Sequence, residues 1–100
     1  MKLFLATALL ATSVGTAAFA ASPLPLKGSE LLTQAKISLT QARNIALAKE
    51  HGTITDQELE KENGGLRYSF DVKVGKVTRE VGIDAVTGKI LEDSIDDGKD

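Results

Sequence analysis

The most regular pattern in the chain is an alternation of apolar and polar residues from Leu66 to Val74. Every even position in this stretch is apolar and every odd position is polar. A period of two is typical of a strand in an antiparallel sheet that has one buried face and one solvated face. We therefore predict a strand here, with Tyr68 and Phe70 directed into the core.

The turn after this strand predicts its next partner. A two-residue loop at Gly75-Lys76 would place Phe70 opposite Val81, so that both lie on the apolar face. The same register places Arg79 opposite Val72. That would turn a charge inward unless Arg79 lies at the margin of the sheet.

The preceding turn predicts a strand on the other side. A two-residue turn at Asn63-Gly64 or at Gly64-Gly65 would bring Leu59 to the same apolar face. Ile54 is out of phase with Leu59, so we expect a β-bulge or a strand end near Asp56.

A last hairpin completes the predicted sheet. A four-residue loop from Ala85 to Gly88 would pair Ile83 with Ile90 and set Asp84 opposite Lys89. Because the three registers share one apolar face, they support one another. The sequence predicts a four-stranded antiparallel meander.

One helix is predicted before the sheet. Ser38 is a good N-cap, and Gln41 is placed to complete a capping box. Helical spacing of apolar residues indicates a helix from about Leu39 to His51, with Gly52 as a left-handed stop. The apolar face of the sheet needs this helix as its cover, so the predicted fold class is α+β: one main helix packed on one face of the meander.

The N-terminal residues resemble a targeting segment. Residues 1–20 combine a positive start, an apolar stretch and Ala18-Phe19-Ala20, which predicts a signal peptide cleaved before Ala21. The stretch is too polar and short for a good membrane anchor. Residues 21–36 are expected to be a linker in which Ser29 could cap a short helix.

Composition limits the possible partners. Cleavage would remove one lysine, change the formal charge from −2 to −3 and leave an 80-residue chain, 100 minus 20. An acidic chain with no basic cluster has no electrostatic reason to bind nucleic acid or an anionic membrane. The absence of cysteine excludes disulfides and a lipidated N-terminal cysteine.

Catalysis is not expected from these residues. The single histidine, His51, falls at the end of the helix, where a cation favours the helix dipole. Without cysteine, a Cys-His pair is impossible, and neither an H-E-x-x-H motif nor a phosphate-binding glycine loop occurs. We assign no catalytic, cofactor-binding or metal-ligating residue and expect no cofactor.

Two groups of carboxylates were weighed as sites. Asp93, Asp96 and Asp97 offer the oxygen ligands that calcium prefers, but their spacing matches no calcium loop. We interpret residues 94–100 as an acidic, flexible tail. A second group shares the outer face of the first strand and is interpreted as a solvated surface: Glu58, Glu60 and Glu62.

The first strand offers one feature that favours protein binding. In a meander, the strand from Thr53 to Glu62 would have one free hydrogen-bonding edge. An extended peptide could add there by β-augmentation.

Residues 37–93 resemble the PepSY domain. The most specific part of the resemblance is the final hairpin, in which alternating aliphatic residues precede an Asp-Ala-Val-Thr-Gly turn at 84–88. The other matching pieces are Ile37-Ser38-Leu39-Thr40-Gln41-Ala42, Leu59-Glu60, Tyr68-Ser69-Phe70-Asp71-Val72 and Val81-Gly82-Ile83.

The resemblance implies a non-enzymatic, exported binding module. Members occur in propeptides of thermolysin-like metallopeptidases, in spore-germination proteins and as stand-alone exported domains. This implies a periplasmic or secreted protein that holds a peptidase inactive or assists its folding. Because the sequence ends at Asp100, that action is expected in trans, on an envelope or secreted peptidase. The alternative is an envelope sensor or adaptor for a small ligand or metal ion; the oligomeric state stays open.

Overall fold

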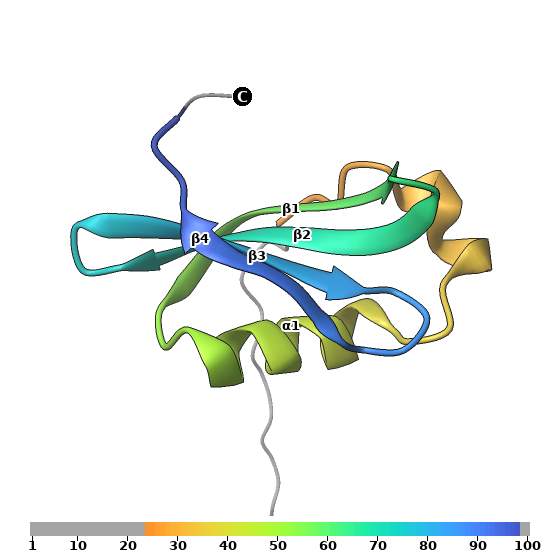
Figure 1. The fold of residues 1–100 in the computed structure, drawn as a ribbon, viewed down its shortest axis with the longest axis horizontal. Coiled ribbons are helices and arrows are strands. Elements are labelled where there is room, and N and C mark those ends of the chain that lie inside the picture. The colour runs from red at the N-terminus through yellow and green to blue at the C-terminus, as the bar shows by residue number, and fades with distance from the viewer. Residues whose placement is uncertain (1–23, 99–100) are drawn as a thin grey trace, which may run out of the picture.

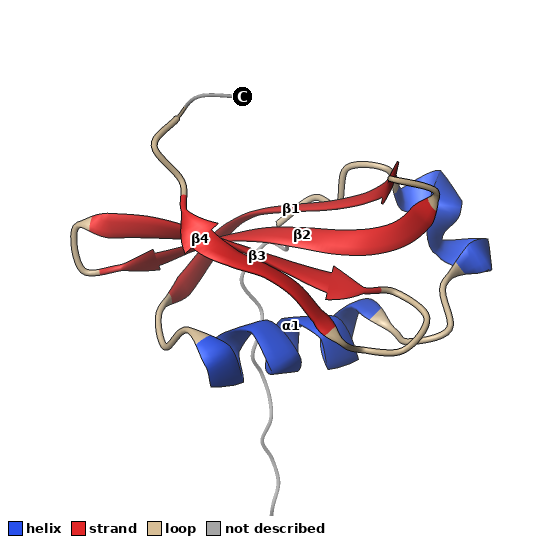
Figure 2. Ribbon diagram, viewed as in Figure 1, coloured by secondary structure: helices blue, strands red, loops and turns tan. Residues whose placement is uncertain are grey.

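The structure is a computed structural model that describes residues 24–98. One helix packs along one face of a four-stranded antiparallel sheet whose strand order is β1-β2-β3-β4 (Figures 1 and 2), so the predicted fold class is confirmed. The predicted signal peptide and its cleavage site lie outside the described residues. The elements are the 3-10 helix η3 (Ser29–Gln34), the helix α1 (Leu39–Lys49), and the strands β1 (Thr53–Glu62), β2 (Gly65–Val74), β3 (Val77–Asp84) and β4 (Ile90–Ile95).

The capping box at the start of α1 is confirmed. The Gln41 amide donates to Ser38 Oγ at 3.1 Å, and the Ser38 amide donates to Gln41 Oε1 at 2.8 Å. The expected end of the helix is wrong in two respects. The helix stops at Lys49, and Gly52 is not left-handed. Gly52 instead passes so close to the carbonyl group of Lys73 on β2 that an added Cβ would collide with it.

The predicted strand registers are confirmed. Phe70 pairs with Val81 across β2 and β3, and Leu59 pairs with Tyr68 across β1 and β2. The β1–β2 turn is the Asn63-Gly64 alternative, with φ of 55° and 82° at its two residues. Two successive residues of positive φ are the signature of a type I′ hairpin, which follows the twist of its strands.

Two β-bulges adjust the pairing. The expected irregularity in β1 lies between Ile54 and Asp56, where Thr55 is the extra residue. A second bulge in β4 was not predicted: Ile83 pairs with Ile90, while the preceding Gly82 pairs with Glu92. The extra residue in β4 is Leu91.

The core lies between α1 and the inner face of the sheet. Ala42 and Ala46 are fully buried, and their small side chains let the helix approach the strands closely. The rings of Tyr68 and Phe70 stack with centroids 6.2 Å apart. The Tyr68 hydroxyl donates to the Ile37 carbonyl at 2.8 Å, which satisfies its polar end. The other buried apolar residues are Ile54, Leu59, Leu66, Val72, Val81, Ile83 and Ala85.

The stretch predicted as a linker lies against the sheet from Leu24 onward. The Lys27 amide donates to the Gln57 carbonyl at 3.2 Å, and the Leu59 amide donates to the Lys27 carbonyl at 2.8 Å. The expectation that β1 has a free hydrogen-bonding edge is therefore wrong at its middle, where Lys27 forms a parallel bridge with Glu58. The expected Ser29 cap is also wrong, because Gly28 caps η3 with φ of 78° and no side-chain bond.

A buried glutamine holds this segment in place. Gln57 is polar, yet it lies on the inner side of β1 and is only 2% exposed. Its amide donates to the Leu24 carbonyl at 2.8 Å, and its Oε1 accepts from Arg43 Nη1 at 2.7 Å. Gln57 therefore links α1, β1 and the N-terminal segment through satisfied hydrogen bonds.

Candidate functional site

The sheet face opposite α1 is the candidate site, and we call it the open acidic face. The two-residue alternation of each strand places most of the charged residues here, while most of the apolar residues face the helix. Arg67 and Lys27 are the cations that contact these acids. The acids of the open acidic face are Asp56, Glu58, Glu60, Glu62, Asp71, Glu80, Glu92 and Asp96.

Half of the face is organised around Arg67, which is 8% exposed. Its Nη2 lies 2.8 Å from Glu92 Oε1, and its Nε donates to Ser69 Oγ at 2.9 Å. The bond from Arg67 lowers the pKa of the Glu92 carboxyl. Three further carboxylates lie 3.5 to 3.8 Å from the guanidinium: Glu60, Glu62 and Glu80.

Gly82 on β3 makes room for the guanidinium of Arg67. A Cβ at Gly82 would collide with Nη2 of Arg67 and lie only 2.5 Å from its Cζ. The alternation had placed Arg67 on the solvated face, whereas the structure buries it. The available signal was the glycine inside a strand, which often marks a close approach.

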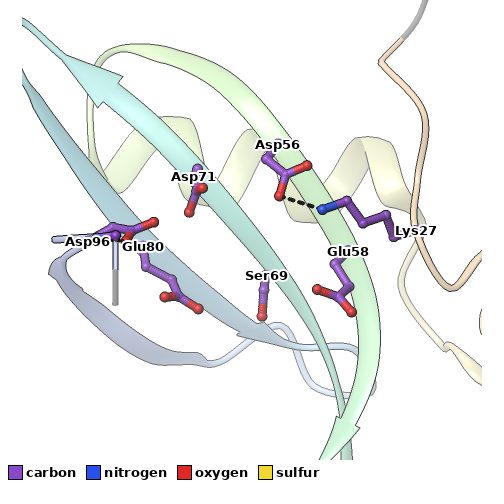
Figure 3. Close-up of a pocket in the computed structure, with 8 residues that line it drawn as sticks. Lys27, Asp56, Glu58, Ser69, Asp71, Glu80 and Asp96 are labelled. Carbon is purple, nitrogen blue, oxygen red and sulfur yellow. Dashed lines mark hydrogen bonds and ion pairs between the residues drawn. The ribbon is translucent and has the colours of Figure 1, made fainter. Parts of the chain in front are cut away.

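The other half of the face contains a cavity of about 250 Å³ (Figure 3). At its rim, Lys27 Nζ lies 3.1 Å from Asp56 Oδ2. The residues that line the cavity come from the N-terminal segment, from each of β1, β2 and β3, and from the chain after β4. They are Lys27, Asp56, Glu58, Ser69, Asp71, Glu80, Asp96 and Gly98.

Three carboxylates crowd together inside this cavity. Asp71, Glu80 and Asp96 each offer an oxygen, and these atoms lie within 4.8 Å of one another. Burial, followed by the contact with Asp96, raises the pKa of Asp71 to about 6. Burial also raises the pKa of Glu80, and Glu92 adds to that effect. Oxygen ligands of this kind suit a hard cation such as Ca²⁺.

The acids weighed from the sequence do not come together. Asp93 lies on the helix side, with its Oδ1 2.9 Å from Arg79 Nη2 and its Oδ2 3.9 Å from Lys49 Nζ. Asp96 enters the cavity with Asp71 instead, so the expectation that Asp96 belongs to a flexible tail is wrong. Ser94 and Ile95, which had been assigned to the tail, continue β4.

The outer-face glutamates of β1 also differ from the prediction of a merely solvated surface. Glu58 lines the cavity, and Glu60 accepts from Ser69 Oγ at 2.8 Å. Glu62 lies 3.5 Å from Arg67. The partners of Glu60 and Glu62 lie on β2, two residues along the strand from the residue directly opposite each glutamate. His51 is exposed, with Nε2 3.1 Å from the Ala48 carbonyl.

Within residues 24–98, none of the helices has the length and apolar character needed to cross a membrane. The fold and the open acidic face define a class of protein: a small α+β domain with one helix-covered face and one charged face. The sequence matches the PepSY family, described as the peptidase propeptide and YPEB domain, over residues 36–93. The chain belongs to this family, whose members are propeptide-like binding or regulatory modules, not catalytic domains.

Two similar proteins extend the comparison. The uncharacterized protein YkoJ of Bacillus subtilis (strain 168) is 34% identical over 74 residues, which are 73% of this chain and 42% of YkoJ. A crystal structure described as that of a lipoprotein from Clostridium difficile 630 matches with a TM-score of 0.58 and 22% identity. That match covers 60% of this chain and 40% of the other. The chain thus spans less than half the length of both, and the structural match supports the fold alone.

Proposed function

We propose that this protein is an exported, non-enzymatic binding module that restrains a separate peptidase or assists its folding. Membership of the PepSY family over residues 36–93, nearly the whole folded part, is the observation that carries this proposal. Export is supported by the signal-like pattern of residues 1–20. The open acidic face would supply the contact surface, because α1 occupies the other face of the sheet.

The charge of this face favours a basic partner surface. Its carboxylates outnumber the cations Arg67 and Lys27 that contact them. Complementary charge steers partners together and suppresses wrong ones, whereas its contribution to affinity varies. We therefore expect binding to a basic patch on the peptidase, with a rate of association that falls as salt rises.

The test begins with affinity capture of residues 21–100 from the envelope extract of the source cells, followed by mass spectrometry. A retained peptidase is then assayed with increasing amounts of the domain. The expected result is saturable slowing, or improved recovery after refolding, at micromolar concentration. Absence of any bound peptidase would contradict the proposal.

Two charge reversals show whether the open acidic face is the contact. Asp56→Lys reverses a carboxylate at the rim of the cavity, where it is paired only with the exposed Lys27. Glu30→Lys makes the same change at an exposed residue of η3 that does not line the cavity. We expect Asp56→Lys to weaken the complex and Glu30→Lys to leave it unchanged. Equal affinities would remove this face from the proposal.

A second candidate is an envelope sensor or adaptor that binds a metal ion. The observation that favours it is the proximity of Asp71, Glu80 and Asp96, whose mutual repulsion a cation would relieve. A ligand at 100 times its Kd would raise the free energy of unfolding by about 2.7 kcal/mol. Thermal unfolding with Ca²⁺, Zn²⁺ or Cu²⁺, in wild type and in Asp71→Asn, tests it. If none of these ions changed the unfolding temperature, metal binding would be excluded for this candidate.

A further inference from the structure

The two edge strands of the sheet differ in whether another segment of the chain bonds to them. On β1, the N-terminal segment binds the backbone of Gln57 and Leu59 through Lys27, and Gly28 lies against the Leu59 carbonyl. On β4, no described segment pairs with the outer side, since β4 ends the strand order and the single isolated bridge belongs to β1. Figure 1 shows β4 at the margin of the sheet. An unpaired edge is a template for strand addition.

The hydrogen-bond pattern identifies the outward backbone groups. The Asp96 amide donates to the Thr78 carbonyl on β3 at 2.8 Å. Because bonding direction alternates along an antiparallel strand, the backbone groups of Ile95 and Asp93 point away from β3. The Asp93 carbonyl accepts from Arg79 Nη2 at 3.1 Å. A carbonyl has two lone pairs, so it retains capacity for a second donor.

The side chains that flank this edge differ between its two sides. On the helix-covered side, Ile95 is 62% exposed and Ile90 is 38% exposed, and the ion-paired Asp93 lies between them. On the open side, β4 presents Glu92 and the chain continues to Asp96. The helix-covered side of this edge thus carries two exposed isoleucines, and the open side is acidic. A strand that alternates aliphatic and basic residues would match both sides.

We propose that the outer edge of β4 docks an extended segment of alternating aliphatic and basic residues, which adds as a fifth strand. This inference rests on the proposed binding role and specifies the chemistry of the partner segment. The aliphatic side chains would extend the apolar surface of Ile90 and Ile95. The basic side chains would lie beside the carboxylates of Glu92 and Asp96.

A second copy of the chain fits this edge less well. Antiparallel pairing of two β4 strands would bring the acids of both copies onto one seam, with Glu92 and Asp96 from each. Like charges across paired strands are destabilising. The charge of the edge therefore selects a basic segment over self-association.

The probe is a fluorescein-labelled octapeptide of alternating lysine and valine, titrated into residues 21–100 and followed by anisotropy. We expect saturable binding that weakens as salt rises. Two control peptides isolate the two kinds of contact. Alternating glutamate and valine tests charge, and N-methylation at alternate residues of the lysine peptide removes the backbone donors that face β4. Neither control peptide is expected to bind.

Protein variants locate the binding on β4. Ile95→Pro removes an outward N–H that makes no bond to β3, a change that edge strands tolerate. We expect it to weaken binding about tenfold, or about 1.4 kcal/mol. Ile95→Ala retains the N–H but loses apolar contact, so it should weaken binding less than Ile95→Pro. Val86→Ala truncates an exposed residue in the β3–β4 turn and should bind like wild type. Far-ultraviolet circular dichroism verifies that each variant is folded.

The outcomes separate this inference from the proposed function. Three results would contradict the proposal that β4 is a docking edge. The lysine peptide could fail to bind, the N-methylated peptide could bind equally well, or the protein could dimerise through β4. A peptidase captured equally by wild type and Ile95→Pro would overturn this proposal too, while the proposed function stood. Peptide binding at β4 without any captured peptidase would support the edge and contradict the peptidase proposal.

Discussion

Arg79 on β3 binds Asp93 on β4 with three hydrogen bonds on the helix-covered side of the sheet. Its Nη2 and Nε lie 2.9 and 3.1 Å from Asp93 Oδ1, and Nη2 also donates to the Asp93 carbonyl at 3.1 Å. Glu50, directly after α1, lies 3.4 Å from Arg79 Nε. The inward charge opposite Val72, confirmed by the register, is thus an ion-paired residue that joins α1, β3 and β4.

Replacement of Arg79 by alanine should lower the free energy of unfolding by roughly 1–3 kcal/mol at pH 7, because it leaves two partly buried carboxylates with only the more distant Lys49 as a cation. Hydrogen bonding to Asp93 already raises the pKa of Glu50. This decrease in the free energy of unfolding should become smaller as pH falls to 4, because Glu50 then takes up a proton. Urea unfolding at both pH values measures the effect.

Arg79→Lys is the control for this change, since it retains the charge but cannot make the same paired bonds. Its free energy of unfolding should lie between those of wild type and Arg79→Ala. An Arg79→Ala variant as stable as wild type at pH 7 would show that this cluster contributes nothing to folding.

Phe70→Ala should be the most damaging core change. The side chain is fully buried and stacks with Tyr68, so its loss should cost about 3–5 kcal/mol and unfold much of so small a domain. Tyr68→Phe retains the ring and removes the bond to the Ile37 carbonyl, so it should cost only about 1 kcal/mol. Thermal unfolding ranks the two, and a stable Phe70→Ala variant would contradict the core assignment.

Asp71→Asn should stabilise the protein at high pH. The pKa of Asp71 is raised from 3.8 to about 6 in the folded state, so the folded protein holds this proton more tightly than the unfolded chain. Stability from this group is therefore lost as pH rises from about 4 to about 6. The variant should exceed wild type by roughly 1 kcal/mol at pH 8, after allowance for solvent screening.

The comparison is made by urea unfolding at pH 3.5 and pH 8. At the lower pH both forms are uncharged at this position, and the difference should nearly vanish. An advantage of Asp71→Asn that stayed constant across this range would show that the carboxylate crowding is not its cause.

Gly82→Ala should displace Arg67 from its place on the open acidic face, because the new Cβ would occupy the space of the guanidinium. Loss of its buried contacts should cost roughly 1–3 kcal/mol, measured by thermal unfolding. The matched control is Gly65→Ala, which lies at the start of β2 with nothing closer than 3.9 Å to an added Cβ. Equal stabilities of the two variants would contradict the role of Gly82.

Much of this fold could be predicted from the sequence because its signals are local. The Ser38 capping box, the alternation along β2 and the positive-φ turn at Asn63-Gly64 each depend on residues only a few positions apart. Turn length then fixes the strand register, since pairing proceeds outward from each hairpin. Pairs as distant as Tyr68 and Ile83 follow from that local information.

The errors arose where a local signal had two physical explanations. A glycine after a helix commonly adopts the left-handed conformation, but Gly52 is required by a backbone approach to Lys73, which lies far along the chain. The proline-containing segment before η3 has the composition of a linker, yet Lys27 bonds to the edge of β1.

The element order, the meander and the side of the sheet that α1 covers follow from the sequence, because side-chain period and turn chemistry act between near neighbours. The meeting of charges depends more on the tertiary structure. The predicted register already sets Asp71 opposite Glu80, but Asp96 joins them from beyond β4, and its approach depends on strand twist and side-chain reach. The burial of Arg67 likewise depends on the space that Gly82 leaves on the neighbouring strand.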